Sequence, residues 1–324
     1  MKNVLVKDVE DEERQIKKIA KYTRYIIKGG DNMKIDADKI KENVSNLGKN
    51  VSKKVEGGKE QITKAIDQNG DGQITIEDVI IMGLKIPGIR INRSEFLKKE
   101  FSKNYSEEVI EQIIQYNPAH ENISLDVIDK IADDVIQYER LCVSGISTAL
   151  SAPGGFAMVA TLPTDIAQYY GYMLRAMQKL LYLYGFPEID IKENQILDSE
   201  TMNTIIICMG VMYGVAGANT ALKSMAKALG LGVEKKLINK ALTKGTIYPI
   251  VKSVAKWFNV RMTKEIFAGF FKKSIPVVGG LIGGGITYLS FKPCCEKLKN
   301  TLHDTTLSNP NLKDDTEIIE IKDE

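Results

Sequence analysis

The chain contains 324 residues with a formal net charge of +2, and 27% of its residues are charged while 44% are hydrophobic. This composition excludes a chain that is disordered throughout and argues against a polytopic membrane protein. The near-neutral total hides three unlike blocks: residues 1–220 carry a net charge of −5, residues 221–300 carry +12, and residues 301–324 carry −5. The +12 block indicates a polyanionic partner.

The N-terminal sequence MKNVLVKDVEDEER is charged throughout and has no apolar core of a secretory signal, so we expect a cytoplasmic protein. No Cys-x-x-Cys pair occurs, and a chain with two histidines is a poor candidate for a zinc site. Reduced structural thiols are expected at Cys142, Cys208, Cys294 and Cys295.

Hydrophobic spacing predicts helices almost throughout the chain and no convincing strand. Residues 34–66 form a Lys-rich, weakly amphipathic stretch, which is typical of a solvated surface helix or a helix on a lipid surface. Ser94 and Ser106 are expected to cap the next two helices. The predicted helices after the stretch are 94–103, 106–116, 124–150, 163–185, 198–229, 232–243, 247–272 and 276–300.

These elements predict an all-α protein: a bundle of glycine-rich, closely packed apolar helices, preceded by a helical segment with one EF-hand-like loop. The boundary is expected near Pro87–Gly88, which gives an N-terminal region over residues 1–92 and a helical domain over 93–300. The acidic tail, residues 301–324, is predicted to be disordered.

A metal-binding loop is predicted over residues 67–78, DQNGDGQITIED. Oxygen-bearing side chains recur at alternate positions, and Gly72 permits the sharp turn after the third of them, as an EF-hand calcium loop requires. Gln73 would coordinate through its backbone carbonyl, and Ile74 would pack inward. The predicted ligands are Asp67, Asn69, Asp71, Gln73, Thr75 and Asp78.

The residue that closes this loop is Asp78, where EF-hand loops usually have Glu. The shorter side chain reaches the cation less easily with both oxygens, so the coordination number and the calcium affinity should fall. Mg²⁺, which needs six ligands, therefore rivals Ca²⁺. No second loop is visible, which favours a structural or weakly sensing site over a paired switch.

Three stretches carry no charge: residues 141–164, 201–222 and 274–291. Each is long enough to span a membrane. However, Pro153-Gly154-Gly155 interrupts the first, and five of the eighteen residues in the third are glycine. Glycines at a spacing of four allow helices to approach closely either in lipid or in a protein core. Buried core helices are favoured, and membrane insertion remains the alternative.

Residues 221–273 are rich in basic residues with aromatic residues interleaved among them, and this mixture suits an anionic membrane surface. A merely solvated basic face is the alternative. Nucleic acid is not the expected partner, because no helix-turn-helix, RNA-recognition or zinc module is present.

The predicted helix 163–185 carries a stripe of polar residues at helical spacing. This face would either line a pocket that binds a small molecule or substrate, or serve the fold, with Asp165 stabilising the start of the helix and Arg175 in an ion pair. The candidate pocket residues are Asp165, Gln168, Tyr172 and Arg175.

Two stretches carry a resemblance to a known family. SAPGGFAMVATLPTDIAQYYGYMLRAMQKLLYLYGF at 151–186 and KSIPVVGGLIGGGITYLSF at 273–291 resemble signature segments of the bacterial EcsC family. An Asn often follows the glycines of the second segment in that family, and Ile286-Thr287-Tyr288 stands here instead. The resemblance covers residues 93–300, implies an all-α domain and implies no established reaction.

The functional expectation is a calcium- or magnesium-binding, non-enzymatic EcsC-like interaction protein. It would be cytoplasmic, peripheral at the inner membrane surface, and would have an unidentified protein partner. The alternative is an enzyme or small-molecule binder that uses the polar face of helix 163–185.

Overall fold

A computed structural model describes the backbone of residues 63–151, 157–189, 197–273, 279–312 and 321, and the side chains of these residues except 146–165 and 262–287. The described chain is helical and contains no strand, which confirms the all-α prediction. The helices are α4 (Ile76–Leu84), α5 (Arg93–Phe101), α6 (Glu107–Gln115), α7 (Leu125–Ser151), α8 (Ala157–Leu183), α9 (Ser199–Tyr213), α10 (Ala218–Gly230), α11 (Lys235–Thr243), α12 (Tyr248–Lys273) and α13 (Gly279–His303).

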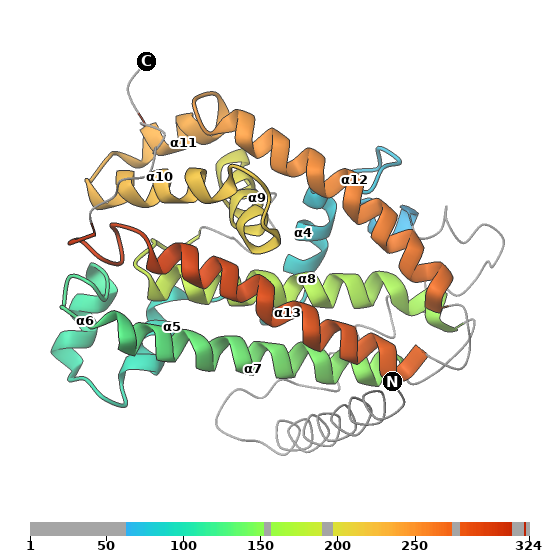
Figure 1. Ribbon diagram of the computed structural model, residues 1–324, viewed down its shortest axis with the longest axis horizontal. Helices are drawn as coiled ribbons and strands as arrows, with labels where there is room; N and C mark the ends of the chain where they lie inside the picture. Colours follow the sequence, from blue (N-terminus) through green and yellow to red (C-terminus); the bar gives the residue numbers. More distant parts are fainter. Residues whose placement is uncertain (1–62, 152–156, 190–196, 274–278, 313–320, 322–324) are drawn as a thin grey trace, which may run out of the picture.

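Three long helices, α7, α8 and α13, pack against one another and run the length of the molecule (Figure 1). The shorter helices α9, α10 and α11 lie on one side of them together with α12, and α4 lies between α12 and α8. Helices α5 and α6 pack against each other, and α5 contacts α8. This arrangement places the predicted metal loop, which precedes α4, beside α12.

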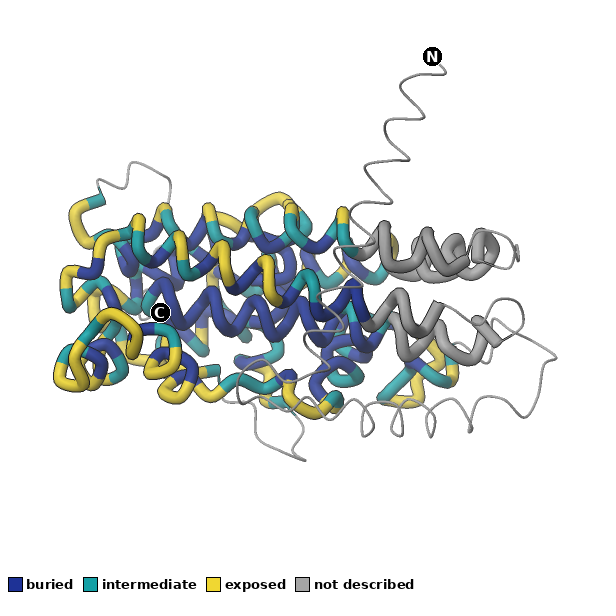
Figure 2. The backbone as a smooth tube through the Cα atoms, turned by 90° about the horizontal axis from the view of Figure 1, so that it is seen from below, coloured by how far each residue is buried: buried dark blue, intermediate teal, exposed yellow. Residues whose placement is uncertain are grey.

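One cluster of buried apolar side chains runs through the described structure, from Ile66 to Leu307 (Figure 2). It includes Ile76, Val79 and Ile80 of α4, which are fully buried. The predicted boundary at residue 92 is therefore not a break in the core, because residues 66–89 contribute to the same cluster as the long helices. The expected helix over 34–66 lies outside the described residues up to residue 62.

Helix α4 crosses α8 at two glycines. A Cβ atom on Gly83 would lie 3.1 Å from the backbone nitrogen of Gly171, and one on Gly171 would lie 3.3 Å from the carbonyl oxygen of Gly83. The absence of side chains at these positions lets the two backbones touch. Close packing through small residues was predicted for the apolar runs, but this crossing lies outside them.

Helix boundaries differ from the predictions in identifiable places. The predicted helix 198–229 is interrupted, because Gly214 and Gly217 have φ values of +71° and +83° and turn the chain between α9 and α10. Helix α5 is capped by Asn92, whose side chain accepts a hydrogen bond from the N–H of Glu95, rather than by Ser94. Ser106 occupies the predicted N-cap position of α6 without a capping side-chain bond.

The predicted disordered tail begins at residue 301, but the structure describes an ordered chain up to residue 312. Helix α13 continues to His303, and Leu302, Thr305 and Leu307 are buried. These side chains are buried together with the core. The acidic composition of residues 301–324 as a whole gave no indication of this burial. Residues 313–320 and 322–324 lie outside the described residues.

The apolar run 201–222 forms α9 and the start of α10, and its side chains from Ile205 to Met212 are buried. A Cβ atom on Gly210 would lie 2.8 Å from Val254 of α12 and 2.9 Å from Ala218 of α10, so this glycine permits a tight three-helix contact. Most side chains of the runs 141–164 and 274–291 are outside the described set. Within the described residues, no helix combines the length and the apolar composition that crossing a bilayer requires.

Candidate metal centre

The predicted metal loop lies between a short helical turn, residues 63–66, and α4. The Asp67 carboxylate accepts hydrogen bonds from the N–H groups of Gly70 at 2.6 Å and Gly72 at 2.8 Å. Both glycines have a φ of +78°, a left-handed conformation in which a side chain would be strained. The chain therefore curls around the carboxylate of Asp67, as the spacing of the ligands predicts.

The next two predicted ligands are exposed and continue the same pattern. The side-chain oxygen of Asn69 accepts from the N–H of Asp71 at 2.8 Å, and Oδ1 of Asp71 accepts from the N–H of Gln73 at 2.8 Å. These short-range bonds hold each side-chain oxygen over the loop backbone, where it retains lone pairs for a cation. The loop is therefore arranged by its own main chain.

Asp78 is fully buried and caps α4. Its Oδ2 atom accepts from the N–H of Thr75 at 2.9 Å and from the hydroxyl of Thr75 at 2.6 Å. Its Oδ1 atom accepts from the N–H of Gln68 at 2.9 Å. Thr75 and Asp78 thus form a capping box at the start of α4, and the bond from Gln68 joins the two ends of the loop.

The oxygen atoms of the loop fit a hard divalent cation with a low coordination number. A carboxylate oxygen accepts through about two lone pairs, so Oδ2 of Asp78 is fully used and Oδ1 retains one. Asp78 would accordingly bind through a single oxygen. Together with Asp67, Asn69 and Asp71, this gives an all-oxygen shell that suits Mg²⁺ or weakly held Ca²⁺.

Across the described part of the chain, no three or more His, Cys, Asp or Glu side chains are gathered as a metal site would require. Three of the predicted ligands are of other kinds: the amide of Asn69, the backbone carbonyl of Gln73 and the hydroxyl of Thr75. The third carboxylate, that of Asp78, is held against the start of α4. Cation binding through all six positions would draw Asp78 toward the exposed acids of the loop.

The hydrogen bond from the Gly72 N–H is the main cause of a lowered pKa for Asp67. Desolvation opposes this effect on the pKa, and further backbone N–H groups, led by that of Gly70, add to it. The carboxylate is therefore ionised at neutral pH, which is the form that binds a metal ion.

The loop is anchored to α12. The N–H of Ile76, at the start of α4, donates to Oδ1 of Asn259 at 3.0 Å. Ile74 is buried, as predicted, but the described residues place α12 beside the loop instead of a second loop. Sequence reasoning missed Asn259, because its partner is 183 residues away and no local pattern links the two.

The polar stripe of α8 is buried, and most of its described side chains hold other parts of the protein. Nε of Arg175 donates to Oε1 of Glu139 on α7 at 2.9 Å, and Nη1 of Arg175 donates to the carbonyl of Gly88 at 2.5 Å. Lys179 donates to the same Glu139 oxygen at 2.5 Å. Glu139 is fully buried, so it compensates two buried cations.

Gln178, on the same helix, binds the segment that follows α4. Its amide nitrogen donates to the carbonyl of Ile89 at 3.0 Å, and its oxygen accepts from the N–H of Ile91 at 3.1 Å. With Arg175 bonded to Gly88, the stripe fastens residues 88–91 to α8. This is a structural role for Arg175, one of the four residues that the sequence placed in a pocket, and for Gln178 on the same face.

The other candidate pocket residues have different surroundings. Tyr172 is buried and its phenol has a raised pKa, chiefly through desolvation. Gln168 is buried, and its Oε1 atom has no hydrogen-bond partner among the described residues. The side chain of Asp165 is not among those described. The residues that the structure does show bonded, Arg175 and Gln178, both point at protein groups.

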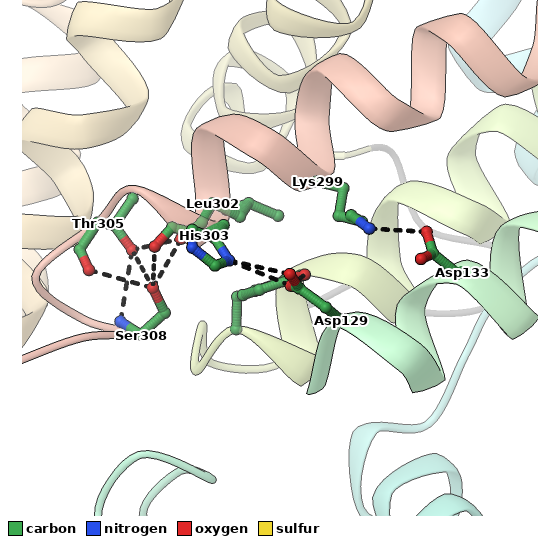
Figure 3. Close-up of polar contacts among 8 residues, drawn as sticks. Asp129, Asp133, Lys299, Leu302, His303, Thr305 and Ser308 are labelled. Atoms are coloured by element: carbon green, nitrogen blue, oxygen red, sulfur yellow. Dashed lines mark hydrogen bonds and ion pairs between the residues drawn. The ribbon is translucent and has the colours of Figure 1, made fainter. Parts of the chain in front are cut away.

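A second polar cluster, absent from the sequence predictions, joins α7 to the end of α13 (Figure 3). Nδ1 of His303 lies 3.1 Å from Oδ2 of Asp129, and the hydroxyl of Tyr184 donates to Oδ1 of the same carboxylate. Ser308 lies near His303 in the chain, but its hydroxyl bonds to the carbonyls of Leu302 and His303 at 2.7 and 3.0 Å. Ser308 therefore closes the end of α13 and is not arranged as a nucleophile beside the imidazole.

The basic segment forms an exposed surface on α11 and α12. No acidic residue occurs between Lys235 and Arg261 in the sequence. On α12 a surface hollow is lined by Ser253, Lys256, Trp257, Val260 and Arg261. The exposed basic side chains are Lys235, Lys236, Lys240, Lys244, Lys252, Lys256 and Arg261.

Comparisons with family models, curated proteins and solved structures found no match to this chain. The resemblance to the EcsC family therefore stays a prediction from the two sequence segments.

Proposed function

We propose that this chain is a calcium- or magnesium-binding, non-enzymatic interaction protein of the EcsC type. The observation that carries the metal part is the loop around Asp67, whose carboxylate accepts from Gly70 and Gly72 while both glycines adopt left-handed conformations. Such a loop exposes several side-chain oxygens over a short span, which is the arrangement that hard cations select.

A non-enzymatic role is favoured over the pocket alternative because Arg175 and Gln178, on the polar face of α8, hold other parts of the fold. Arg175 compensates Glu139 and binds Gly88, and Gln178 binds Ile89 and Ile91. A substrate would have to displace these bonds before it could use the same groups.

Isothermal titration calorimetry at millimolar Ca²⁺ and Mg²⁺ tests the metal site. Wild-type protein should release or absorb heat with each ion, and Asp71→Ala should abolish that heat without unfolding the protein, because Asp71 is exposed. Asp126→Ala, which removes an exposed acid from α7, is the matched control and should leave the heat unchanged. The absence of heat in wild type, or its persistence in Asp71→Ala, would contradict the proposal.

The choice between the two ions rests on Asp78. We expect Asp78→Glu to raise the affinity for Ca²⁺ more than that for Mg²⁺, because the longer carboxylate can offer both oxygens to the larger ion. Parallel titrations of the two ions measure this ratio, and an unchanged ratio would show that Asp78 does not close the shell.

Peripheral binding to an anionic membrane surface, from the cytoplasmic side, is a second candidate function. The exposed lysines of α11 and α12, with no acid among them, favour it. Sedimentation with phosphatidylglycerol vesicles at low ionic strength should carry the protein down, and added salt should release it. A protein that stays in the supernatant at low salt would remove this part of the proposal.

A further inference from the structure

The hollow on α12 combines positive charge with apolar surface. Lys256 and Arg261 are exposed on its wall, Ser253 adds a hydroxyl, and Val260 is 54% exposed. The stretch of α12 from Tyr248 to Arg261 contains no acidic residue. An anion that enters the hollow therefore meets two cations, and the first acidic residue of α12 is Glu265, which follows this stretch.

Trp257 forms the aromatic part of the hollow and is held in place from behind. Its ring packs against Phe258 with centroids 5.0 Å apart and against Tyr213 of α9 at 6.2 Å. The guanidinium of Arg261 lies 5.1 Å from the centre of the Trp257 ring, a cation–π arrangement that places the charge at the mouth. The hollow is therefore a shaped feature of α12 and not a set of unrelated surface side chains.

We propose that this hollow binds the phosphate headgroup of an anionic phospholipid. Lys256 and Arg261 would take the phosphate oxygens, Ser253 would donate a hydrogen bond, and Trp257 and Val260 would meet the apolar boundary below the headgroup. The inference rests on the membrane part of the proposed function and assigns it to one place. A lipid is favoured over a soluble phosphate because an exposed valine and a tryptophan beside the cations gain from an apolar phase.

The sequence contains a single tryptophan, so the fluorescence of Trp257 reports on the hollow alone. We expect phosphatidylglycerol vesicles to shift its emission to the blue, and brominated acyl chains in those vesicles to quench it. Phosphatidylcholine vesicles and free inorganic phosphate should change it little. A full response to inorganic phosphate alone would overturn the lipid assignment in favour of a soluble anion.

Variants separate this site from general attraction to a charged surface. Lys256→Gln/Arg261→Gln should lower partitioning into phosphatidylglycerol vesicles by at least about tenfold, since each basic residue near the surface adds about fivefold. Lys99→Gln/Lys103→Gln removes the same charge from exposed positions near α5, away from α12 in Figure 1, and should lower it by less than about twofold.

The outcomes distinguish the two proposals. Vesicle binding that both double variants weaken equally, or binding without quenching of Trp257, would overturn the headgroup site and leave peripheral membrane binding standing. Failure of wild-type protein to sediment with the vesicles would remove both.

Discussion

The metal loop and the polar stripe of α8 both carry several polar side chains, and the hydrogen bonds of these side chains differ in range and burial. In the loop, Asp67, Asn69 and Asp71 bond to backbone groups two to five residues further along the chain. In the stripe, Arg175 bonds to Glu139 and Gly88, which are 36 and 87 residues away in sequence. The loop is exposed to solvent, whereas the stripe is buried.

This difference shows which polar residues are free to take part in function. Local bonds to the main chain preserve lone pairs on the side chains and cost little to rearrange. Buried long-range bonds use the side chain fully, and breaking them leaves charges without partners in a region of low dielectric. The loop is accordingly the better candidate for a ligand and the stripe the better candidate for stability.

Glu139→Gln should give the largest effect, because it leaves Arg175 and Lys179 buried without their anion. We expect the free energy of unfolding to fall by about 3–5 kcal/mol, measured by urea denaturation. Glu107→Gln, which breaks the exposed pair with Lys98, is the control and should cost less than about 1 kcal/mol. A loss at Glu139 no greater than that of the control would show that the stripe is not a structural network.

Gln178→Ala tests the attachment of residues 88–91 and should give an intermediate effect. The substitution leaves the carbonyl of Ile89 and the N–H of Ile91 without this partner, at a cost of about 2 kcal/mol. The same denaturation experiment on Gln112→Ala, an exposed position of α6, should show a change below about 0.5 kcal/mol. Equal values for the two variants would contradict the role given to Gln178.

The smallest effect concerns the pH dependence of the loop. Because backbone hydrogen bonds lower the pKa of Asp67, its contribution to stability is complete above the unfolded value of about 3.9 and is lost as the pH falls through the folded value. With a chelator present, the difference in thermal midpoint between wild type and Asp67→Asn should stay constant from pH 7 to 5 and shrink below pH ~4. A difference that already declines above pH 5 would contradict this assignment.

The sequence predicted the helical class and most helix positions, because apolar spacing and capping residues are local signals. It predicted the turn around Asp67 for the same reason, because Asp67, Asn69, Asp71 and Gly72 lie close together in the chain, while their role as ligands stays a prediction. The break between α9 and α10 required the backbone conformations of Gly214 and Gly217, which composition does not reveal. The calcium, membrane and family predictions remain proposals.

Long-range partners were beyond the reach of the sequence. Nothing in the sequence around Glu139 on α7 indicates that it is buried in an ion pair. Its two partners, Arg175 and Lys179, come from α8. Asn259 likewise gains its role only when α12 meets the start of α4. The order of residues 301–312 depends on a core surface that other helices provide.

The crossing of Gly83 and Gly171 sets a mechanical limit on the loop. Helix α4 touches α8 backbone to backbone there, and Arg175 and Gln178 fasten the residues that follow. In sensor-type EF-hands, cation binding swings one helix away from the other. Here the helix that leaves the loop is held near its C-terminal end and just after it, so we expect any displacement produced by a cation to move the chain before Asp67. Helix α4 would then stay in place while the chain on the N-terminal side of the loop moves.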